Sequence, residues 1–264
     1  MAPGVISFDL DGTLIQGPFG RVLTDLQDTL AAAGVAGAKT AIQRRHRELL
    51  VTDPLAAYDW DAIVGGYLSD AGLRPPFDLI ERLNEHVRRG ETRILHERTF
   101  EGIGALRSAG WRVVVLTNGW RRYQEPILRG IGMLDAVDQL LTADDIGLPK
   151  PAAEAFAAAR GGATEHVHVG DRIDHDIVGG NRAGARTVLL RPDVPIQGAG
   201  SDDDPAVIDY LRELAERQNA LPVEPPGLTI PDYFETSMSG VVDAVIRSST
   251  EDWTAGNSVC STTS

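Results

Sequence analysis

Two carboxylates close behind the first apolar run of the chain stand where they could do chemistry together. Asp9 and Asp11 lie two residues apart at the exit of an expected first strand, and Gly12 follows them. Because side chains alternate between the faces of a strand, both carboxylates point to one side, and the glycine permits a sharp turn. Like charges this close repel unless a cation, a proton or different surroundings separate their roles. The pair therefore predicts a metal ion, a proton, or both at this place.

Polar residues also follow several later apolar runs. From Gly110 onward, short β-branched runs alternate with amphipathic stretches, which is typical of βα units around a parallel sheet. Strands are expected at residues 113–116, 137–141, 166–169 and 187–190. The polar residues behind these runs are Thr117, Asn118, Lys150, Asp171 and Asp176. Since ligands of open α/β sheets bind outside the carboxyl ends of the strands, these residues and the aspartate pair are predicted to meet at one edge.

Lys150 stands out by residue type. The basic residues of the chain are almost all arginine, and the two lysines are Lys39 and Lys150. Lys150 lies between Pro149 and Pro151, behind an expected strand. We interpret it as a candidate functional residue.

The pattern between the aspartate pair and the second expected strand is helical. Apolar residues recur at helical spacing within residues 22–30, 42–50, 63–68 and 77–87. Gly17-Pro18 and Gly20 at one end and residues 96–98 at the other are typical of hinges. We predict a helical insert at residues 15–96, which covers the site as a lid, and a discontinuous core at residues 1–14 and 97–247.

The C-terminal part of the chain has a less definite pattern. Residues 193–231 are predicted to hold a linker and a helix capped by Asp204-Pro205. This segment could complete the core, cover a sheet edge or contact a second subunit, and the sequence does not choose. Residues 241–246 form a last amphipathic stretch, and the Ser/Thr-rich residues 248–264 are expected to be a flexible tail.

The composition predicts a soluble, globular protein. A chain of 264 residues with 42% hydrophobic residues can form one large domain or a core with a second lobe. A formal net charge of -13 argues against general binding of nucleic acid or anionic membranes. No apolar stretch approaches the roughly 20 residues of a membrane span and no signal peptide is evident, so we expect a cytoplasmic location. Cys260 is the only cysteine, which leaves no disulfide framework or thiolate metal site.

Taken in order, the polar groups resemble the four motifs of the haloacid dehalogenase-like hydrolase superfamily. These groups are Asp9-Leu10-Asp11-Gly12-Thr13, Thr117-Asn118, Lys150-Pro151, and Gly170-Asp171 with Asp176. The resemblance runs from Val5 to about Pro192, and the helical insert stands where the phosphatase branch of this superfamily has its type 1 cap. It implies an α/β fold with a Rossmann-like core, whose parallel sheet carries helices on both faces, and an inserted all-helical cap.

The resemblance also implies phosphoryl transfer through an aspartyl-phosphate. Asp9 would be the nucleophile, and Asp11 would be the general acid and then the general base. Lys150 would neutralise Asp9 and the transferring group. The phosphate would be bound by Thr117, Asn118, Lys150 and Gly12. A Mg²⁺ ion, which suits an all-oxygen site, would be held by Asp9, the backbone carbonyl of Asp11, Asp171 and Asp176.

Other activities of the superfamily need different residues. Haloacid dehalogenases lack an aspartate at the place of Asp11, so this residue argues against dehalogenation. A phosphonatase needs a lysine in the cap, for which Lys39 is the one poorly placed candidate. A sugar-phosphate mutase and a non-catalytic binding or regulatory module of the same fold stay open. We predict a Mg²⁺-dependent phosphatase of a small phosphorylated metabolite, monomeric or homodimeric, with neither nucleic acid nor a membrane as partner.

Several further polar residues receive a structural interpretation, and for all of them except Asp174 the alternative is a contact with the substrate or the site. Tyr58 and Trp60 are assigned to the core of the insert, and Arg44–Arg47 to a solvated helix face. Near the fourth motif we expect Asp174 in solvent or at a helix cap, His175 at the surface, and Arg172 either near the site or pointing outward.

Overall fold

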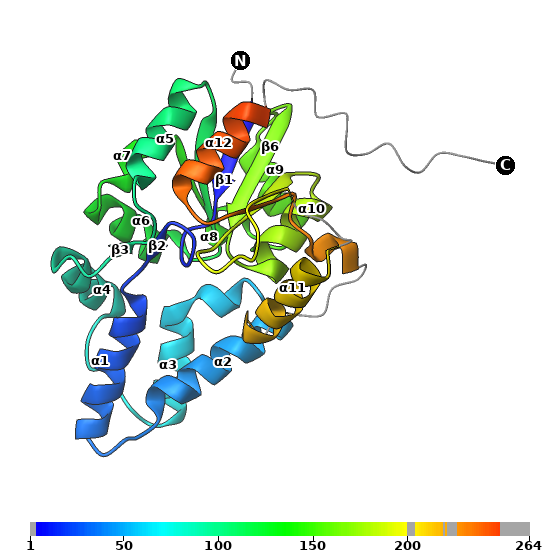
Figure 1. Ribbon diagram of the computed structural model, residues 1–264. Helices are drawn as coiled ribbons and strands as arrows, with labels where there is room; N and C mark the ends of the chain where they lie inside the picture. Colours follow the sequence, from blue (N-terminus) through cyan, green and yellow to red (C-terminus); the bar gives the residue numbers. More distant parts are fainter. Residues whose placement is uncertain (1–3, 200–203, 219, 221–225, 249–264) are drawn as a thin grey trace.

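A seven-stranded sheet forms the core of the protein (Figure 1). The computed structural model describes residues 4–199, 204–218, 220 and 226–248. The strand order is β5-β4-β1-β6-β7-β9-β8, and all neighbours from β5 to β9 run parallel. The strands are β1 (Gly4–Phe8), β4 (Arg112–Thr117), β5 (Gln139–Thr142), β6 (Glu165–Gly170), β7 (Arg186–Leu190), β8 (Gly198–Ala199) and β9 (Tyr233–Glu235).

The chain reverses its winding direction at β1. From β1 it passes to β4 and β5 on one side, and it then returns to β6 and β7 on the other side. Such a reversal leaves a crevice outside the carboxyl ends of the central strands, which is where ligands bind in open parallel sheets. Because β1 ends at Phe8 and β6 ends at Gly170, Asp9 and Asp171 emerge at this crevice.

Three of the expected strands lie within β4, β6 and β7, whereas the strand expected at residues 137–141 begins later. The reason is a local exchange of hydrogen bonds at Asp138. Its backbone N donates to Val113 O over 2.8 Å, and its carboxylate Oδ2 accepts from Val113 N, also over 2.8 Å. Asp138 thus bonds to β4 partly through its side chain and is not itself part of the strand, which begins at Gln139.

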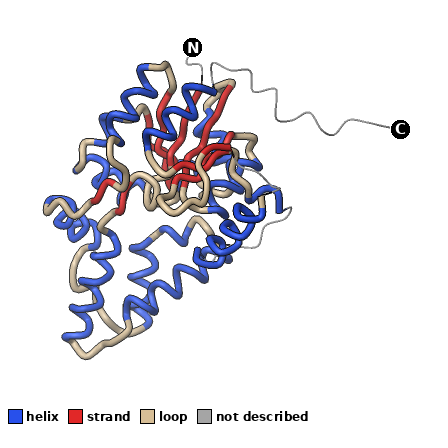
Figure 2. The backbone as a smooth tube through the Cα atoms, viewed as in Figure 1, coloured by secondary structure: helices blue, strands red, loops and turns tan. Residues whose placement is uncertain are grey.

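Helices cover both faces of the sheet, as the α/β prediction requires (Figure 2). One face packs against a cluster that includes Ile103, Leu128 and Val241, and the other against a cluster built around Phe156. The helices of the first face are α5 (Thr99–Ser108), α6 (Arg121–Gly130), α7 (Met133–Ala136) and α12 (Met238–Ser248). Those of the second face are α8 (Ala143–Ile146), α9 (Ala153–Arg160) and α10 (Val178–Arg182), which the π-helical turn η2 (Ile173–Ile177) precedes.

The helical insert is present between β1 and α5, and all four expected helices are found. Its elements are α1 (Phe19–Ala32), α2 (Ala38–Thr52), η1 (Ala56–Tyr58), α3 (Trp60–Asp70) and α4 (Leu79–Arg88). Helix α4 begins at Leu79, after Phe77, because Asp78 Oδ1 accepts from Glu81 N and caps the first turn. Where the insert leaves and rejoins the core, β2 (Ile15–Gln16) and β3 (Arg93–Ile94) pair as an antiparallel ribbon. In Figure 1 α1, α2 and α3 lie below the carboxyl edge of the sheet.

The C-terminal segment extends the sheet and completes a face of the core. Strand β9 adds to β7 in parallel, and β8 pairs with β9 in antiparallel orientation. Helix α11 (Pro205–Gln218) packs against η2, and η3 (Pro226–Thr229) leads into β9. Helix α12 packs against α5. The tail is predicted at residues 248–264. Ser248 is the last residue of α12, and residues 249–264, with Cys260, lie outside the described residues.

Within the residues that the structure describes, we find no helix with both the length and the apolar character that crossing a membrane requires.

Candidate active site

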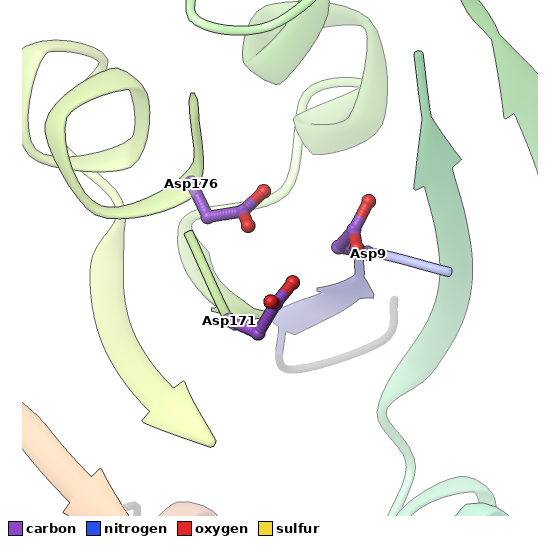
Figure 3. A group of neighbouring side chains, drawn as sticks. All are labelled: Asp9, Asp171 and Asp176. Atoms are coloured by element: carbon purple, nitrogen blue, oxygen red, sulfur yellow. The ribbon is translucent and has the colours of Figure 1, made fainter. Parts of the chain in front are cut away.

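Three carboxylates converge at the crevice of the sheet. Asp9 follows β1, Asp171 follows β6, and Asp176 lies in η2. One oxygen from each of the three side chains lies within 4.8 Å of the others, and Figure 3 shows the carboxylates facing a common space. Asp9 and Asp176 are buried, at 8% and 1% exposure. The prediction that these three residues lie close together is therefore confirmed.

Gly12 and Thr13 shape the turn that brings Asp9 to Asp171. Gly12 has a φ of +97°, and a Cβ at this position would lie 2.8 Å from Asp171 Oδ1. A side chain is thus excluded both by the backbone conformation and by the close approach. Thr13 Oγ1 lies 3.2 Å from Asp9 Oδ2 and 3.3 Å from Asp171 Oδ1, so its hydroxyl can donate to either carboxylate.

Lys150 supplies a buried cation to this cluster. Its Nζ donates to Asp9 Oδ1 and to Asp176 Oδ1, both over 2.6 Å, and its side chain is 2% exposed. The Asn118 side chain holds the backbone of Lys150 in place. Asn118 Oδ1 accepts from Lys150 N over 2.7 Å, and Asn118 Nδ2 donates to Lys150 O over 3.0 Å. Asn118 therefore fixes the peptide of Lys150 from the neighbouring loop.

The charges of the cluster are unbalanced. Although burial acts to raise the pKa of Asp176, the Lys150 ammonium and the His168 hydrogen bond hold it below its ordinary value. Burial, followed by the charges of Asp9 and Asp176, raises the pKa of Asp171 to about 7, although Arg191 lies 3.6 Å from its Oδ2. A third carboxylate so close to the other two binds a proton or needs a further cation. The arrangement favours a divalent metal ion.

Asp11 lies apart from the three converging carboxylates. Its Oδ2 accepts from Gln124 Nε2 over 2.8 Å and its Oδ1 from Gly17 N over 3.3 Å. The residue is exposed, and these two contacts engage both oxygens of its carboxylate. Partial removal of water by the surrounding protein raises the pKa of Asp11 to about 6, against the opposing effect of the Gln124 hydrogen bond. A carboxyl group with such a pKa can both give and take a proton near neutral pH.

Thr117 and Asn118 lie where the sequence predicts them, at and directly behind the end of β4. Thr117 is buried, and its Oγ1 accepts from Gly119 N over 3.2 Å. Besides its bond to Lys150, Asn118 Nδ2 donates to the hydroxyl of Tyr58 over 3.0 Å. Tyr58 thus brings the insert into contact with the site, which the assignment of this residue to the core of the insert did not predict.

Residues 4–184 match the family model of the haloacid dehalogenase-like hydrolases. The chain belongs to this family. Its helical insert lies between β1 and α5, and Asp9, Asp171 and Asp176 meet Lys150 at the carboxyl edge of the sheet.

Curated relatives of this hydrolase carry the names of sugar-phosphate and related phosphatases. It is 33% identical over 127 residues to a ribulose-1,5-bisphosphate 5-phosphatase of Halopiger xanaduensis, which covers 44% of this chain and 53% of the relative. It is 34% identical over 125 residues to a glyceraldehyde 3-phosphate phosphatase of Methanopyrus kandleri, covering 42% and 54%. A phosphoglycolate phosphatase of Colwellia psychrerythraea is 27% identical over 159 residues, covering 56% and 65%. The hydrolase thus matches about half of the length of the first two relatives.

Solved structures share the fold of the hydrolase over most of its length. A HAD phosphatase from Thermococcus onnurineus aligns with a TM-score of 0.61 and 20% identity, covering 92% of this chain and 97% of that one. An L-2-haloacid dehalogenase from Xanthobacter autotrophicus aligns with a TM-score of 0.59 and 15% identity, covering 93% and 98%. Because a phosphatase and a dehalogenase align about equally well, the fold does not choose between these chemistries.

Two residues near the fourth motif differ from their predicted places. Asp174 is 5% exposed and does not lie in solvent, because it forms two hydrogen bonds with the Arg172 guanidinium. The side chain of His175 is 16% exposed, so this histidine is partly buried rather than freely exposed at the surface. The side chain of Arg172 bonds to Asp174 and to the backbone O of Gln218, while its backbone N donates to Asp176 Oδ2 over 3.0 Å.

In the insert, the interpretation of the arginine cluster as a solvated helix face holds for its three arginines, of which Arg44 and Arg47 are exposed. Arg44 and Arg45 form ion pairs with Glu48 and Asp70 near the surface. His46, by contrast, stacks on Trp60 with ring centroids 4.7 Å apart and belongs to the interior of the insert.

Gln124 is a further contact of the candidate site that sequence reasoning missed. It lies on α6, is 7% exposed, and bonds to Asp11. A Cβ at Gly119 would lie 2.0 Å from Gln124 Nε2, so the glycine after Asn118 leaves room for this side chain. The signal in the sequence was a polar residue on the buried face of an amphipathic helix, which alone does not reveal its partner.

Proposed function

We propose that this hydrolase is a Mg²⁺-dependent phosphatase that cleaves a phosphomonoester of a small metabolite through an aspartyl-phosphate. The observation that carries the proposal is the place of Asp11. It stands two residues after the candidate nucleophile, has an exposed side chain held by Gln124 and Gly17, and has a pKa raised to about 6. A phosphate ester needs a proton donor for its leaving alkoxide, whereas a halide leaves without protonation.

The donor set fits a magnesium ion. Asp9, Asp171 and Asp176 offer carboxylate oxygens from one small space, and Mg²⁺ prefers oxygen ligands of this kind. Together with the backbone carbonyl of Asp11, these residues would hold the ion. When bound, the ion would offset the negative charge of the carboxylates and of the phosphate.

Mg²⁺ is expected to raise the Tm more at pH 8 than at pH 5. The pKa of Asp171 in the folded protein, about 7, lies above its unfolded value, so the protonated form stabilises the metal-free fold at low pH. This contribution is lost as the pH rises through about 7, where the ionised carboxylate becomes free to bind the ion. Each pH unit below 7 should weaken Mg²⁺ binding about tenfold, or about 1.4 kcal/mol. Thermal unfolding with EDTA and with Mg²⁺ at both pH values measures the effect, and equal shifts would contradict it.

In the first half of the reaction, Asp9 would attack the phosphorus atom of the substrate. A bond forms between an Asp9 carboxylate oxygen and phosphorus, and the bond between phosphorus and the ester oxygen breaks. Asp11 would give its proton to the departing oxygen, so that an alcohol leaves. Lys150, bonded to Asp9 Oδ1 in the structure, would orient the carboxylate and offset the charge of the phosphoryl group.

In the second half, water would hydrolyse the aspartyl-phosphate. Asp11, now ionised, takes a proton from the water as its oxygen bonds to phosphorus, and the bond from phosphorus to Asp9 breaks. Inorganic phosphate leaves, Asp9 is again a carboxylate, and Asp11 carries its proton for the next cycle. The hydrogen bonds from Gln124 and Gly17 to Asp11 favour its ionised form and therefore support this second step.

Release of inorganic phosphate from p-nitrophenyl phosphate and a panel of phosphorylated metabolites tests the proposal. The panel should include the three substrates that name the relatives: ribulose 1,5-bisphosphate, glyceraldehyde 3-phosphate and phosphoglycolate. We expect turnover that EDTA abolishes and excess Mg²⁺ restores. Isomerisation of a sugar phosphate without net phosphate release would support the mutase instead. Absence of turnover across the panel would favour a binding module.

A further inference from the structure

A file of three buried polar side chains runs beneath the carboxylate cluster. Ser7 lies on β1, and His166 and His168 lie on β6. Their exposed fractions are 0%, 3% and 0%, respectively. The three residues point to one face of the sheet, because Ser7 pairs with His168 in the strand register and the two histidines are two residues apart. The reaction proposed above uses none of them.

The file ends on Asp176. His168 Nε2 lies 3.1 Å from Asp176 Oδ1, and His168 Nδ1 lies 2.8 Å from Ser7 Oγ. The same hydroxyl lies 2.8 Å from His166 Nε2. The contacts thus form one chain from His166 through Ser7 and His168 to a carboxylate of the site.

The ionised carboxylate of Asp176 determines which nitrogen of each histidine carries a hydrogen. Asp176 Oδ1 already accepts from Lys150, so it is an ionised carboxylate, and the ring nitrogen facing it must carry a hydrogen. In a neutral imidazole the other nitrogen, His168 Nδ1, then accepts, and Ser7 Oγ–H donates to it. Ser7 Oγ in turn accepts from His166 Nε2–H. Burial, which lowers the pKa of His168 and lowers the pKa of His166 to about 3, agrees with two neutral rings.

Burying these three polar side chains stabilises the fold less than apolar side chains in the same space would. Polar groups taken from water cost free energy unless they are hydrogen-bonded, whereas apolar side chains would stabilise the same space. The surroundings are apolar: Phe156 packs edge-on against the His168 ring with centroids 4.9 Å apart, and Val5 lies two residues before Ser7 on the same face. Stability therefore does not account for these polar residues, and their contact with Asp176 is where a functional role would be found.

We propose that His168 is a positioning residue for the metal site, held in one tautomer by Ser7 and His166, and that it fixes the carboxylate of Asp176. Lys150 and His168 donate to Oδ1, and the backbone N of Arg172 donates to Oδ2 over 3.0 Å. With both oxygens engaged by rigid donors, the plane of the carboxylate is set before an ion binds. Partners of this kind orient metal ligands and raise their affinity for the ion. The inference rests on the proposed Mg²⁺ site.

The tautomer is tested first, on the unaltered protein. Long-range ¹H–¹⁵N correlation spectra of ¹⁵N-histidine-labelled protein distinguish Nε2–H from Nδ1–H rings. We expect His168 and His166 both as the Nε2–H tautomer. An Nδ1–H tautomer at His168 would overturn the proposal, because such a ring cannot donate to Asp176.

Two substitutions at His168 then test its action on the site. His168→Leu removes the donor, and we expect the affinity for Mg²⁺, measured by calorimetry without substrate, to fall about 10- to 100-fold. His168→Gln returns an amide N–H near the place of Nε2 and should recover most of this loss. At saturating Mg²⁺ the KM of the leucine variant should stay near that of the unaltered protein while kcat is reduced. Ser7→Ala, which frees the tautomer but keeps the ring, should show a smaller loss of affinity.

Thr187→Val is the matched control. Thr187 is fully buried on β7 and is the register partner of His168, but its hydroxyl bonds to Asn181 and Asp232 rather than to the site. Its loss should lower the Tm without changing Mg²⁺ affinity. A folded His168→Leu variant with unchanged Mg²⁺ affinity would overturn the proposal. If the hydrolase binds Mg²⁺ but releases no phosphate, the proposed function fails while the tautomer and affinity results stand on their own.

Discussion

Replacing Asp9 with asparagine is expected to lower kcat for phosphate release at least about a thousandfold at saturating Mg²⁺. The amide cannot attack phosphorus as a carboxylate does, so neither half of the reaction remains. The variant should fold, because the change removes one of three crowded carboxylates and relieves repulsion. Steady-state phosphate release measures the loss. Mass spectrometry after acid quenching should detect a phosphoryl adduct on the unaltered protein and none on the variant.

The control for this experiment is the same substitution at an exposed aspartate. Asp209 on α11 pairs with Arg212, and the two side chains are 66% and 64% exposed. Asp209→Asn should leave kcat and KM unchanged. Phosphate release by Asp9→Asn at the rate of this control would exclude a covalent aspartyl-phosphate at Asp9.

Replacing Lys150 with methionine is expected to destabilise the protein and to reduce kcat/KM at least about a hundredfold. The ammonium forms ion pairs with Asp9 and Asp176 while only 2% exposed, so its loss leaves buried carboxylates without their partner. Removing one partner of a buried pair costs about 3–5 kcal/mol of unfolding free energy. Urea unfolding in EDTA at pH 8 measures the cost. Mg²⁺ should restore part of the stability, since the ion offsets the same charges, but it should not restore activity.

Lys39 offers a matched control, because it is the other lysine of the chain. Its Nζ donates to Thr24 Oγ1 over 2.8 Å at the surface of the insert. Lys39→Met should change the free energy of unfolding by less than about 0.5 kcal/mol and leave turnover intact. A loss of activity in this variant would support a phosphonatase instead. A loss of stability as large as that of Lys150→Met would show that the buried ion pairs of Lys150 do not account for its effect on stability.

The convergence of the three carboxylates could be predicted from the sequence because Asp9 and Asp171 follow directly behind β1 and β6, with Asp176 in the next turn, η2. A parallel sheet brings the carboxyl ends of its strands to one edge, so Asp9 and Asp171 had to come close whatever the exact bounds of the neighbouring strands β1 and β6. Lys150 comes after the short helix α8, and its contact with Asp9 also depends on the loop that follows this helix. The helical periodicity of the insert was equally clear. These inferences need only local pattern and topology.

The residues that escaped prediction depend on packing between distant elements. Gln124 reaches Asp11 across 113 positions, and Tyr58 reaches Asn118 across 60, so no spacing along the chain reveals either contact. Asp174 was misplaced because a polar residue between two motif aspartates resembles a helix cap. The π-helical turn η2 instead buries it against Arg172. The three-residue strand β9 is too short to give a periodic signal.

The β2–β3 ribbon makes the junction of the insert a natural place to graft. Ile15 pairs with Ile94, and Leu95 N donates to Leu14 O over 3.0 Å, so the two cut ends are held side by side by backbone bonds. The ribbon would hold the two ends of a foreign insert next to each other. The entropic cost of closing a loop grows only slowly with its length, so an insert of different length should be tolerated. Strand order and the carboxylates at the sheet edge would be left as they are. Chimaeras cut at this ribbon therefore exchange the insert while the core is kept, and their turnover of a substrate panel would measure what the insert contributes to substrate choice.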